Sequence, residues 1–376
     1  MQRKIWLSSP HIGEQERSFV EEAFSTNWIA PLGANVDGFE SDLARFTGVE
    51  YVAALSSGTA AIHLALVLLG VTRDDIVLCQ SFTFSGSANP IAYQGAVPVF
   101  IDSENETWNM DPAQLERAIK HYIAENKKPK AIIPVHLYGM PAKLDEILAL
   151  AANYEIPVIE DAAEALGSTY RQQPCGSLGD IGILSFNGNK IITTSAGGAL
   201  LSRNKEWVAK ARFYSTQSRD AAPHYQHSHI GYNYRMSNIL AGIGRGQMQV
   251  LDERIAQRRA NYEFYRNALQ DIPGLEFQPE AKESFSNRWL TCLDIDPSRT
   301  NGITREDLRL QLEKENIESR PLWKPMHLQP VFADAPAFEN GVSAKLFERG
   351  LCLPSGSNLT PEDLERVTAI IRATLT

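Results

Sequence analysis

Seven short apolar runs between residues 50 and 202 constrain the fold of this chain more than any other feature of its sequence. The runs lie at Tyr51–Leu55, Ile76–Cys79, Val97–Ile101, Ala131–Val135, Pro157–Glu160, Gly182–Phe186 and Gly198–Ser202. Helical patterns separate most of them, and buried strands that alternate with helices are typical of an α/β unit with a mostly parallel sheet. The last two runs lie too close together for a crossover helix, so one of these strands is predicted to be antiparallel.

Near residue 250 the alternation of short apolar runs and helical patterns gives way to a long charged segment, which indicates a second structural unit. Residues 250–269 predict one long, charged helix, and a closing helix is expected from Pro361 onward, with Thr360 at its N-cap. Between them lie an apolar strand, another helix and a proline-rich loop. The predicted division is an N-terminal arm, a large α/β domain and a smaller C-terminal α+β domain, at residues 1–30, 31–249 and 250–376.

Composition narrows the class of protein. The 36 Lys and Arg residues against 45 Asp and Glu residues give a formal net charge of −9, which excludes a general nucleic-acid binder. The longest apolar stretch, Ala60–Val71, is too short to span a bilayer, and the N-terminus lacks the apolar core of a signal peptide. A cytoplasmic protein is therefore expected. Its four cysteines form no C-x-x-C pair, so they are predicted to be reduced thiols: Cys79, Cys175, Cys292 and Cys352.

A small-residue turn, Ser56-Ser57-Gly58-Thr59, follows the first strand and opens a helix. Free N–H groups at a helix N-terminus can bind a phosphate, although a simple helix cap is the alternative interpretation. Two familiar nucleotide signatures are missing. Gln247 replaces the last glycine of a G-x-G-x-x-G fingerprint that would begin at Gly242, and no Gly-Lys pair is present for a P-loop.

Two further residues stand just past predicted core strands. Asp161 ends one strand, where ligands bind in open α/β sheets, although it could equally cap a following helix. Lys190 precedes two isoleucines and two threonines, an apolar setting that favours Schiff-base chemistry, although most lysines are solvated surface residues. A phosphate cradle, an acid and a semi-buried lysine are together the parts that hold pyridoxal 5′-phosphate (PLP).

A set of short motifs, spread over nearly the whole chain, resembles the DegT/StrS-type sugar aminotransferases of the aspartate-aminotransferase (fold-type I) superfamily. The resemblance implies a PLP fold-type I enzyme with a mostly parallel seven-stranded sheet between helices and a smaller C-terminal domain. The motifs are Asn27–Gly33, Ser56–Ala61, Phe82–Phe84, Glu160–Ala163, Ser185-Phe186 with Lys190, Gly231–Met236 and Pro321–His327.

The resemblance also implies roles for individual residues toward the cofactor. Lys190 would bind the PLP aldehyde covalently and move a proton during amino transfer. Asp161 would pair with the pyridine nitrogen, and Phe84 would stack on the ring. The residues expected to hold the phosphate are Gly58, Thr59 and Ser185.

Five more residues are assigned by the same resemblance. Asn233 would reach the phosphate of the neighbouring subunit, which makes the expected active unit a homodimer with shared sites. Trp28, Arg235 and His327 would lie near the substrate. Glu164 stands beside the cofactor's 3′-oxygen, where many relatives carry Gln or His, and an acid there departs from the family pattern.

The implied reaction moves an amino group from L-glutamate to a nucleotide-linked keto-sugar. Residues 188–194 and 323–327 are most similar to enzymes that aminate C4 of UDP-linked 4-keto-6-deoxy-N-acetylhexosamines, which supply bacillosamine-type sugars for surface glycans. Competing acceptors are dTDP- or GDP-linked 3- or 4-keto sugars. A non-catalytic, PLP-binding regulatory protein stays open as an alternative. A PLP-dependent dehydratase is disfavoured because those relatives replace the lysine with His, and a nicotinamide oxidoreductase because its glycine fingerprint is missing.

Other chemistry-bearing residues are interpreted as structural. The cluster of His224, His227 and His229 has no flanking acid or Cys and is predicted to lie in a polar loop without a metal. Cys79 and Cys352 sit in apolar runs and are predicted to be inert core residues.

Overall fold

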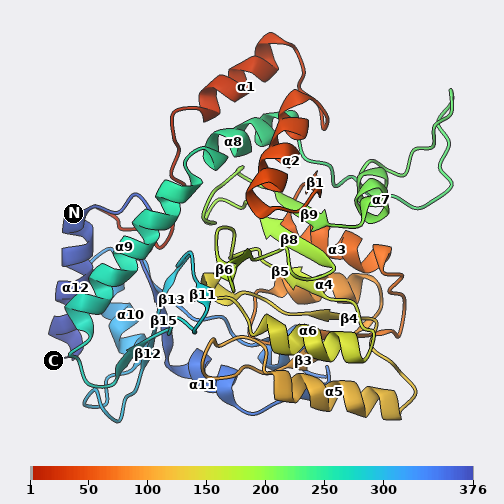
Figure 1. Ribbon diagram of the computed structural model, residues 1–376. Helices are drawn as coiled ribbons and strands as arrows, with labels where there is room; N and C mark the ends of the chain where they lie inside the picture. The colour runs from red at the N-terminus through yellow and green to blue at the C-terminus, as the bar shows by residue number, and fades with distance from the viewer. Residues whose placement is uncertain (1–2, 376) are drawn as a thin grey trace.

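The computed structural model describes residues 3–375, and its centre is one large sheet built from two four-stranded halves (Figure 1). Bridges from Ile132 to Val158 and from Val135 to Asp161 join the halves. In spatial order the strands are β1 (Tyr51–Leu55), β9 (Gly198–Ser202), β8 (Ile181–Ser185), β5 (Ile159–Asp161), β4 (Ala131–Ile133), β2 (Ile76–Gln80), β3 (Val97–Ile101) and β14 (Ala337–Phe338).

The directions of these strands confirm the predicted fold class. Strand β9 is antiparallel to both β1 and β8, and the remaining neighbours are parallel, so one of the last two predicted strands is indeed reversed. The seven predicted strands are all present. The sheet also gains an eighth, β14, because the distant residues Ala337 and Phe338 pair with the outer edge of β3. A two-residue strand leaves no periodic signal in the sequence.

Helices cover both faces of the sheet because alternate strand residues point to opposite sides. On β2, Val77 and Cys79 pack with α3 (Gly58–Leu68) and α4 (Ser85–Tyr93), whereas Ile76 and Leu78 pack into a second cluster on the opposite face. The helices of the first face also include α7 (Lys205–Ser215), and those of the second are α5 (Pro112–Ala124), α6 (Leu144–Asn153), α2 (Ala34–Thr47) and α8 (Asn238–Met248).

The C-terminal part of the chain forms a second, antiparallel sheet. The long helix α9 (Leu251–Leu269) runs from the end of α8 toward it, as Figure 1 shows. The strand order is β10 (Leu275–Phe277), β12 (Thr291–Ile295), β15 (Gly350–Leu353) and β13 (Arg320–Pro321), with α10 (Arg305–Lys314) and α12 (Pro361–Leu375) packed into the same core.

Segments cross between these two parts of the molecule. Ile5, near the N-terminus, pairs with Ile317 and is buried in the C-terminal core, while Phe332 packs into the core beside the large sheet. The predicted division at residues 30 and 249 stays a prediction. The remaining elements are α1 (Glu16–Ser25), α11 (Val342–Arg349), β6 (Thr169–Tyr170), β7 (Gln173–Pro174), β11 (Ser284–Phe285) and the short 3₁₀ turns Leu137–Gly139, Met326–Leu328 and Pro330–Phe332.

The cysteines agree with the prediction of reduced, buried thiols. All four are free and buried, and the thiols of Cys292 and Cys352 share a hydrogen bond at 3.8 Å across β12 and β15 rather than a disulfide. Across residues 3–375, no helix combines the length and the apolar character needed to cross a membrane.

Candidate active site

One pocket brings together the three features that the sequence singled out. It opens at the carboxyl ends of β5 and β8, beside the N-terminus of α3. Seven of the predicted site residues line it: Gly58, Thr59, Phe84, Asp161, Glu164, Ser185 and Lys190. The pocket also includes residues that the sequence did not assign, above all Ser87, Trp289 and Trp323.

The turn after β1 is both a helix cap and an anion cradle. The Ser57 hydroxyl accepts the backbone N–H of Ala60 at 3.0 Å, which is the expected cap. The N–H groups of Gly58 and Thr59 belong to the first turn, where the helix has no carbonyl to offer them, and Ser185 lies opposite. A Cβ added to Gly58 would come within 3.2 Å of the Ser185 side chain, so glycine lets the two walls of the cradle approach.

Asp161 is held as a hydrogen-bond acceptor at the end of β5. Its Oδ2 accepts the Ser87 hydroxyl at 2.7 Å and its Oδ1 accepts the backbone N–H of Ala163 at 3.1 Å. The side chain is buried, yet it lines the pocket. Turns follow the strand, and no helix begins in residues 162–168, so Asp161 does not cap a helix.

Lys190 lies in the loop between β8 and β9, and its amine points into the same pocket. The side chain is 12% exposed, and Ile191 and Ile192 after it are buried, which confirms the predicted apolar setting. The Lys190 Nζ lies 3.5 Å from Glu164 Oε1 and 4.2 Å from the centre of the Trp289 ring. An amine in this position is poorly solvated and directed by a carboxylate and an aromatic face.

Glu164 is a buried acid with two partners. Its Oε2 accepts the backbone N–H of Tyr138 at 2.6 Å, and its Oε1 faces Lys190. Burial raises the pKa of Glu164, and the charge of Lys190 and the Tyr138 N–H only partly oppose this. The acid that departs from the family pattern is therefore an ion-pair partner of the lysine in this chain.

Two of the predicted residues lie on the outside of the molecule. Asn233 follows the long loop after α7, and its Oδ1 accepts the Gln217 side-chain amide at 3.1 Å. Trp28 is 47% exposed and lies beside Gly33, away from the pocket that holds Lys190. Their roles toward a neighbouring subunit or a substrate stay predictions.

Two other predicted residues, Arg235 and His327, contact side chains outside the pocket. The Arg235 guanidinium donates to Glu40 Oε1 at 2.5 Å and to the Ala54 carbonyl at 2.9 Å, so within this chain it forms an internal ion pair. His327 is nearly buried, and its Nδ1 lies 2.6 Å from the Ser81 hydroxyl. Neither residue lines the pocket, and a role of either in substrate binding stays a prediction.

Aromatic rings form one wall of the pocket. Phe84 is 53% exposed, and its ring lies 5.4 Å from that of Trp323. Tyr138 stacks between Trp323 and Trp289, at 6.1 Å and 6.3 Å. Trp323 belongs to a motif that the sequence highlighted, but no local pattern marks Trp289, which reaches the pocket from the C-terminal part of the chain.

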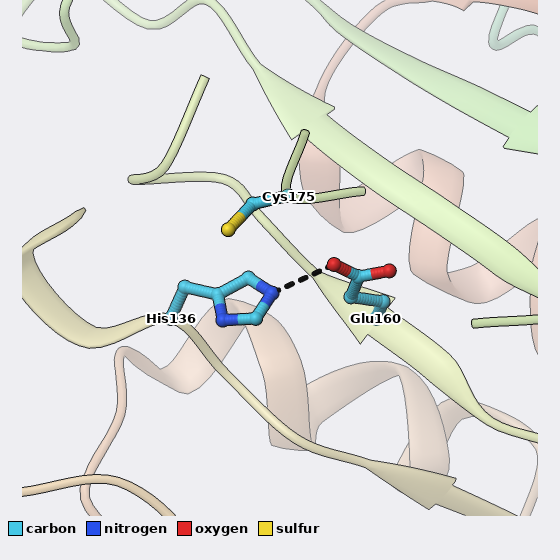
Figure 2. A group of neighbouring side chains, drawn as sticks. All are labelled: His136, Glu160 and Cys175. Carbon is cyan, nitrogen blue, oxygen red and sulfur yellow. Dashed lines mark hydrogen bonds and ion pairs between the residues drawn. The ribbon is translucent and has the colours of Figure 1, made fainter. Parts of the chain in front are cut away.

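A buried cluster behind β5, formed by His136, Glu160 and Cys175, has the composition of a metal site, but the His136 ring and the Glu160 carboxylate are already hydrogen-bonded to each other (Figure 2). His136 Nδ1 accepts the N–H of Ala142 at 3.0 Å, so the proton is on Nε2, which donates to Glu160 Oε1 at 2.8 Å. The Glu160 carboxylate accepts three more N–H groups, from residues 176–179. Burial alone would raise the pKa of Glu160, but these bonds outweigh it and lower the pKa. The cluster with Cys175 is therefore a structural junction.

The histidines of the polar loop form no comparable group among residues 3–375. His227 Nδ1 pairs with the Gln217 carbonyl and His224 with Gln226, and both histidines are exposed. Their position agrees with the predicted loop.

The chemistry of the pocket fits PLP. A weakly solvated amine can take the aldehyde, a charged carboxylate can face the ring nitrogen, and the open N–H groups of a helix N-terminus can hold the phosphate. The amine of Lys190, the carboxylate of Asp161 and the helix N-terminus at Gly58 all line one pocket. The exposed ring of Phe84 lines the same pocket.

Comparisons with known proteins point to the same chemistry. A model of the DegT/DnrJ/EryC1/StrS aminotransferase family matches residues 10–372. EpsN of Bacillus subtilis, whose name assigns it to the pyridoxal phosphate-dependent aminotransferases, is 53% identical over 99% of this chain and 96% of its own. GDP-perosamine synthase of Caulobacter vibrioides is 36% identical over 98% of this chain and 97% of its own. A crystal structure of DesI, determined in the presence of its TDP-sugar product, superimposes with a TM-score of 0.90 at 26% identity, covering 99% of this chain and 93% of that one.

Proposed function

This chain belongs to the DegT/DnrJ/EryC1/StrS aminotransferase family and is a PLP-dependent sugar aminotransferase, and on that premise we propose its substrates and the work of its site residues. The proposed reaction transfers the amino group of L-glutamate to the C4 ketone of a UDP-linked 2-acetamido-2,6-dideoxy-4-keto-hexose, for the synthesis of a surface glycan. The observation that carries the proposal is the convergence of Lys190, Asp161 and the α3 cradle on one pocket.

The cofactor, when bound, supplies an aldehyde that carries the amino group and a ring that withdraws electrons from the reacting carbon. Lys190 Nζ would bind it and, once released, would move a proton as general base and then acid. Asp161 would face the ring nitrogen with its charge, because Ser87 and Ala163 occupy only one lone pair on each oxygen. Gly58, Thr59 and Ser185 would hold the phosphate.

Glu164 and Phe84 would complete the cofactor site. The Glu164 carboxylate would hold the Lys190 amine on the pocket side of the Trp289 ring, from its position 3.5 Å away. The exposed Phe84 ring offers a face for stacking on the cofactor. Both roles follow from side chains that already point into the pocket.

The nucleotide is the least constrained part of the proposal. GDP-perosamine synthases are relatives at 36% identity over almost the whole chain, so a GDP-linked 4-keto sugar is the second candidate acceptor. The similarity of residues 188–194 and 323–327 to UDP-sugar enzymes favours the UDP-linked acceptor.

Parallel assays with three acceptors test the proposed sugar substrate. The purified PLP-loaded protein would be given glutamate and one of three keto-sugars, linked to UDP, GDP or dTDP, while 2-oxoglutarate is measured. The proposal predicts a kcat/KM at least ~10-fold higher for the UDP-linked acceptor, which corresponds to about 1.4 kcal/mol of discrimination. A preference for the GDP-linked sugar would replace the UDP assignment with the second candidate. Absence of turnover with all three would refute nucleotide-sugar amination, and NMR of the product would distinguish C4 from C3.

We also propose a homodimer with shared sites. The loop after α7 extends away from the body of the molecule (Figure 1) and carries the exposed side chains of Tyr225 and Ile230, at 78% and 86%. Apolar side chains on a projecting loop are typical of a subunit contact. Asn233 follows this loop, which supports its role at the phosphate of a second copy.

A further inference from the structure

A fully buried arginine lies directly behind the loop that carries Lys190. Arg258 belongs to α9, is 1% exposed and is one of the largest side chains with no access to solvent. Among the described residues no carboxylate lies within ion-pair distance of it, and its Nε has no hydrogen-bond partner. Burial lowers the pKa of Arg258 to about 9, which leaves the guanidinium charged at neutral pH. A buried, unpaired charge is costly, so its position calls for a reason beyond packing.

The guanidinium holds three distant segments together. Its Nη1 donates to the Trp289 carbonyl at 2.5 Å, and its Nη2 donates to the Ser8 hydroxyl at 3.0 Å and to the Lys190 carbonyl at 3.4 Å. One rigid planar group thus fixes the main chain of Lys190 against the main chain of Trp289.

Two more bonds tighten the same junction. The Ser8 hydroxyl donates to the Asn189 carbonyl at 2.7 Å, and the Trp289 indole N–H donates to that carbonyl at 2.7 Å. The carbonyls of Asn189 and Lys190 are therefore both anchored from behind, while the Lys190 amine projects over the Trp289 ring into the pocket.

The charges around the junction are unevenly placed. Glu164 is the group that faces the Lys190 amine from the pocket side, at 3.5 Å, and Arg258 approaches from the opposite side through the main chain. The other titratable or charged groups nearby are Asp161 in the pocket wall, Tyr138 behind that wall and His11 beside Arg258. Around His11 lie Arg254, Glu253 and Glu16.

We infer that Arg258 is a positioning residue for the cofactor lysine. It fixes the Lys190 loop and the Trp289 ring in one register, so that the Lys190 amine stays beside Glu164 and over the ring face. The inference rests on the proposed role of Lys190.

The test compares R258M and R258K with R259M. Arg259 is the next residue on α9, but it pairs with Glu280 near the surface, so R259M is a matched control. Each holoenzyme would be titrated with pH while the visible absorbance of the lysine-bound cofactor is followed, and kcat and KM for glutamate would be measured.

For R258M we expect the midpoint of the absorbance titration to move by at least about 0.5 pH units, because the lysine nitrogen is no longer held at its distance from the Glu164 carboxylate. We expect kcat to fall at least ~10-fold while KM changes less than ~3-fold, because the lysine is misplaced rather than the donor site. R258K should restore little of the midpoint or of kcat, because an ammonium group cannot reach both carbonyls. R259M should resemble the wild type. A midpoint within about 0.2 units of wild type and a kcat within ~2-fold in R258M would overturn the inference.

A milder pair of variants decides the matter if R258M does not fold. S8A removes the hydroxyl that links Arg258 to Asn189. Within residues 3–375 the Ser9 hydroxyl bonds only to Asn358 at the surface, so S9A is its control. S8A should lower kcat about 3-fold or more and S9A should not, because S8A loses two hydrogen bonds of the junction, the one from Arg258 and the one to Asn189. Equal behaviour of the two would overturn the inference. Borohydride reduction of the wild type separates this result from a failure of the proposed function, because it shows independently whether Lys190 carries the cofactor.

Discussion

The buried carboxylate of Asp102 ties the edge of the large sheet to the start of α11, and the variant D102N tests how much that junction contributes to stability. Asp102 follows β3 and accepts four backbone N–H groups. Its Oδ1 accepts those of Ser103 at 2.7 Å and Ser343 at 3.0 Å, and its Oδ2 accepts those of Asn340 at 2.9 Å and Gly341 at 2.8 Å.

The structure sets the size of the effect. Asparagine has the same shape but only one oxygen, so its amide NH₂ must face two backbone N–H donors in either orientation. A hydrogen bond to a charged acceptor contributes about 1.5–3 kcal/mol, and two are lost, so D102N should destabilise the fold by about 3–6 kcal/mol. At roughly 2 °C per kcal/mol for a chain of this size, the melting temperature should fall by at least about 5 °C.

Thermal denaturation of the apoprotein, followed by circular dichroism, measures this difference. The matched control is D111N, because asparagine caps helices as well as aspartate and the variant loses only the exposed hydrogen bond from Asn340. D111N should change the melting temperature by less than about 1 °C. A loss of less than about 2 °C in D102N would refute the hydrogen-bond argument.

The same carboxylate predicts a pH dependence. Burial alone would raise the pKa of Asp102, but the hydrogen bonds from Ser343, Asn340 and Ser103 outweigh it and hold the pKa below the ordinary value of 3.8. A carboxyl whose pKa is lowered by folding stabilises the protein at every pH above its ordinary pKa. That stabilisation is lost as the pH falls through the pKa of the folded state. The gap between wild type and D102N should therefore stay constant from neutral pH to about 5 and narrow below about 4.

Further predictions concern the active site. K190A should purify folded but show no lysine-bound cofactor band and no turnover, whereas normal turnover would remove Lys190 from the mechanism. D161N should lose at least ~100-fold in turnover, about 3 kcal/mol, because the amide can accept from Ala163 and donate to the Ser87 hydroxyl but has no charge. S87A should lose far less, and a change below ~3-fold in D161N would leave Asp161 without a catalytic role. A mixture of K190A and an Asn233 variant should recover up to about half of the wild-type activity per mixed dimer, and no recovery in dimers verified by mass spectrometry would refute shared sites. E164Q should shift the pH midpoint of the cofactor absorbance downward, because a negative charge 3.5 Å from the amine is removed, and an unchanged midpoint would contradict that ion pair.

The sequence predicted those parts of the molecule that depend on local pattern. Strand and helix periodicity placed all seven main strands and the long helix α9. Because parallel strands end at one edge of a sheet, a turn after β1, an acid after β5 and a lysine after β8 could be expected to meet. The structure confirms this meeting in Gly58, Asp161 and Lys190.

The remaining features depend on contacts between distant segments, for which the sequence carries no local signal. Arg235, whose role at the substrate stays a prediction, pairs with Glu40, 195 residues away in the chain. The Trp289 ring contacts the Lys190 amine from the C-terminal part of the chain. Arg258 donates to the Lys190 carbonyl from the middle of a helix whose sequence pattern shows only many charged residues. Periodicity reports which face of an element is buried, and not what the buried group touches.

Borohydride reduction followed by peptide mass spectrometry tests the central claim most directly. The PLP-loaded protein would be reduced, digested and searched for a lysine that carries a stable pyridoxyl group. The account predicts one modified peptide, with the group on Lys190 and with K190A unmodified under the same conditions. Modification of a different lysine, or of none in a protein that binds PLP, would contradict the assignment of this pocket as the site of amino transfer.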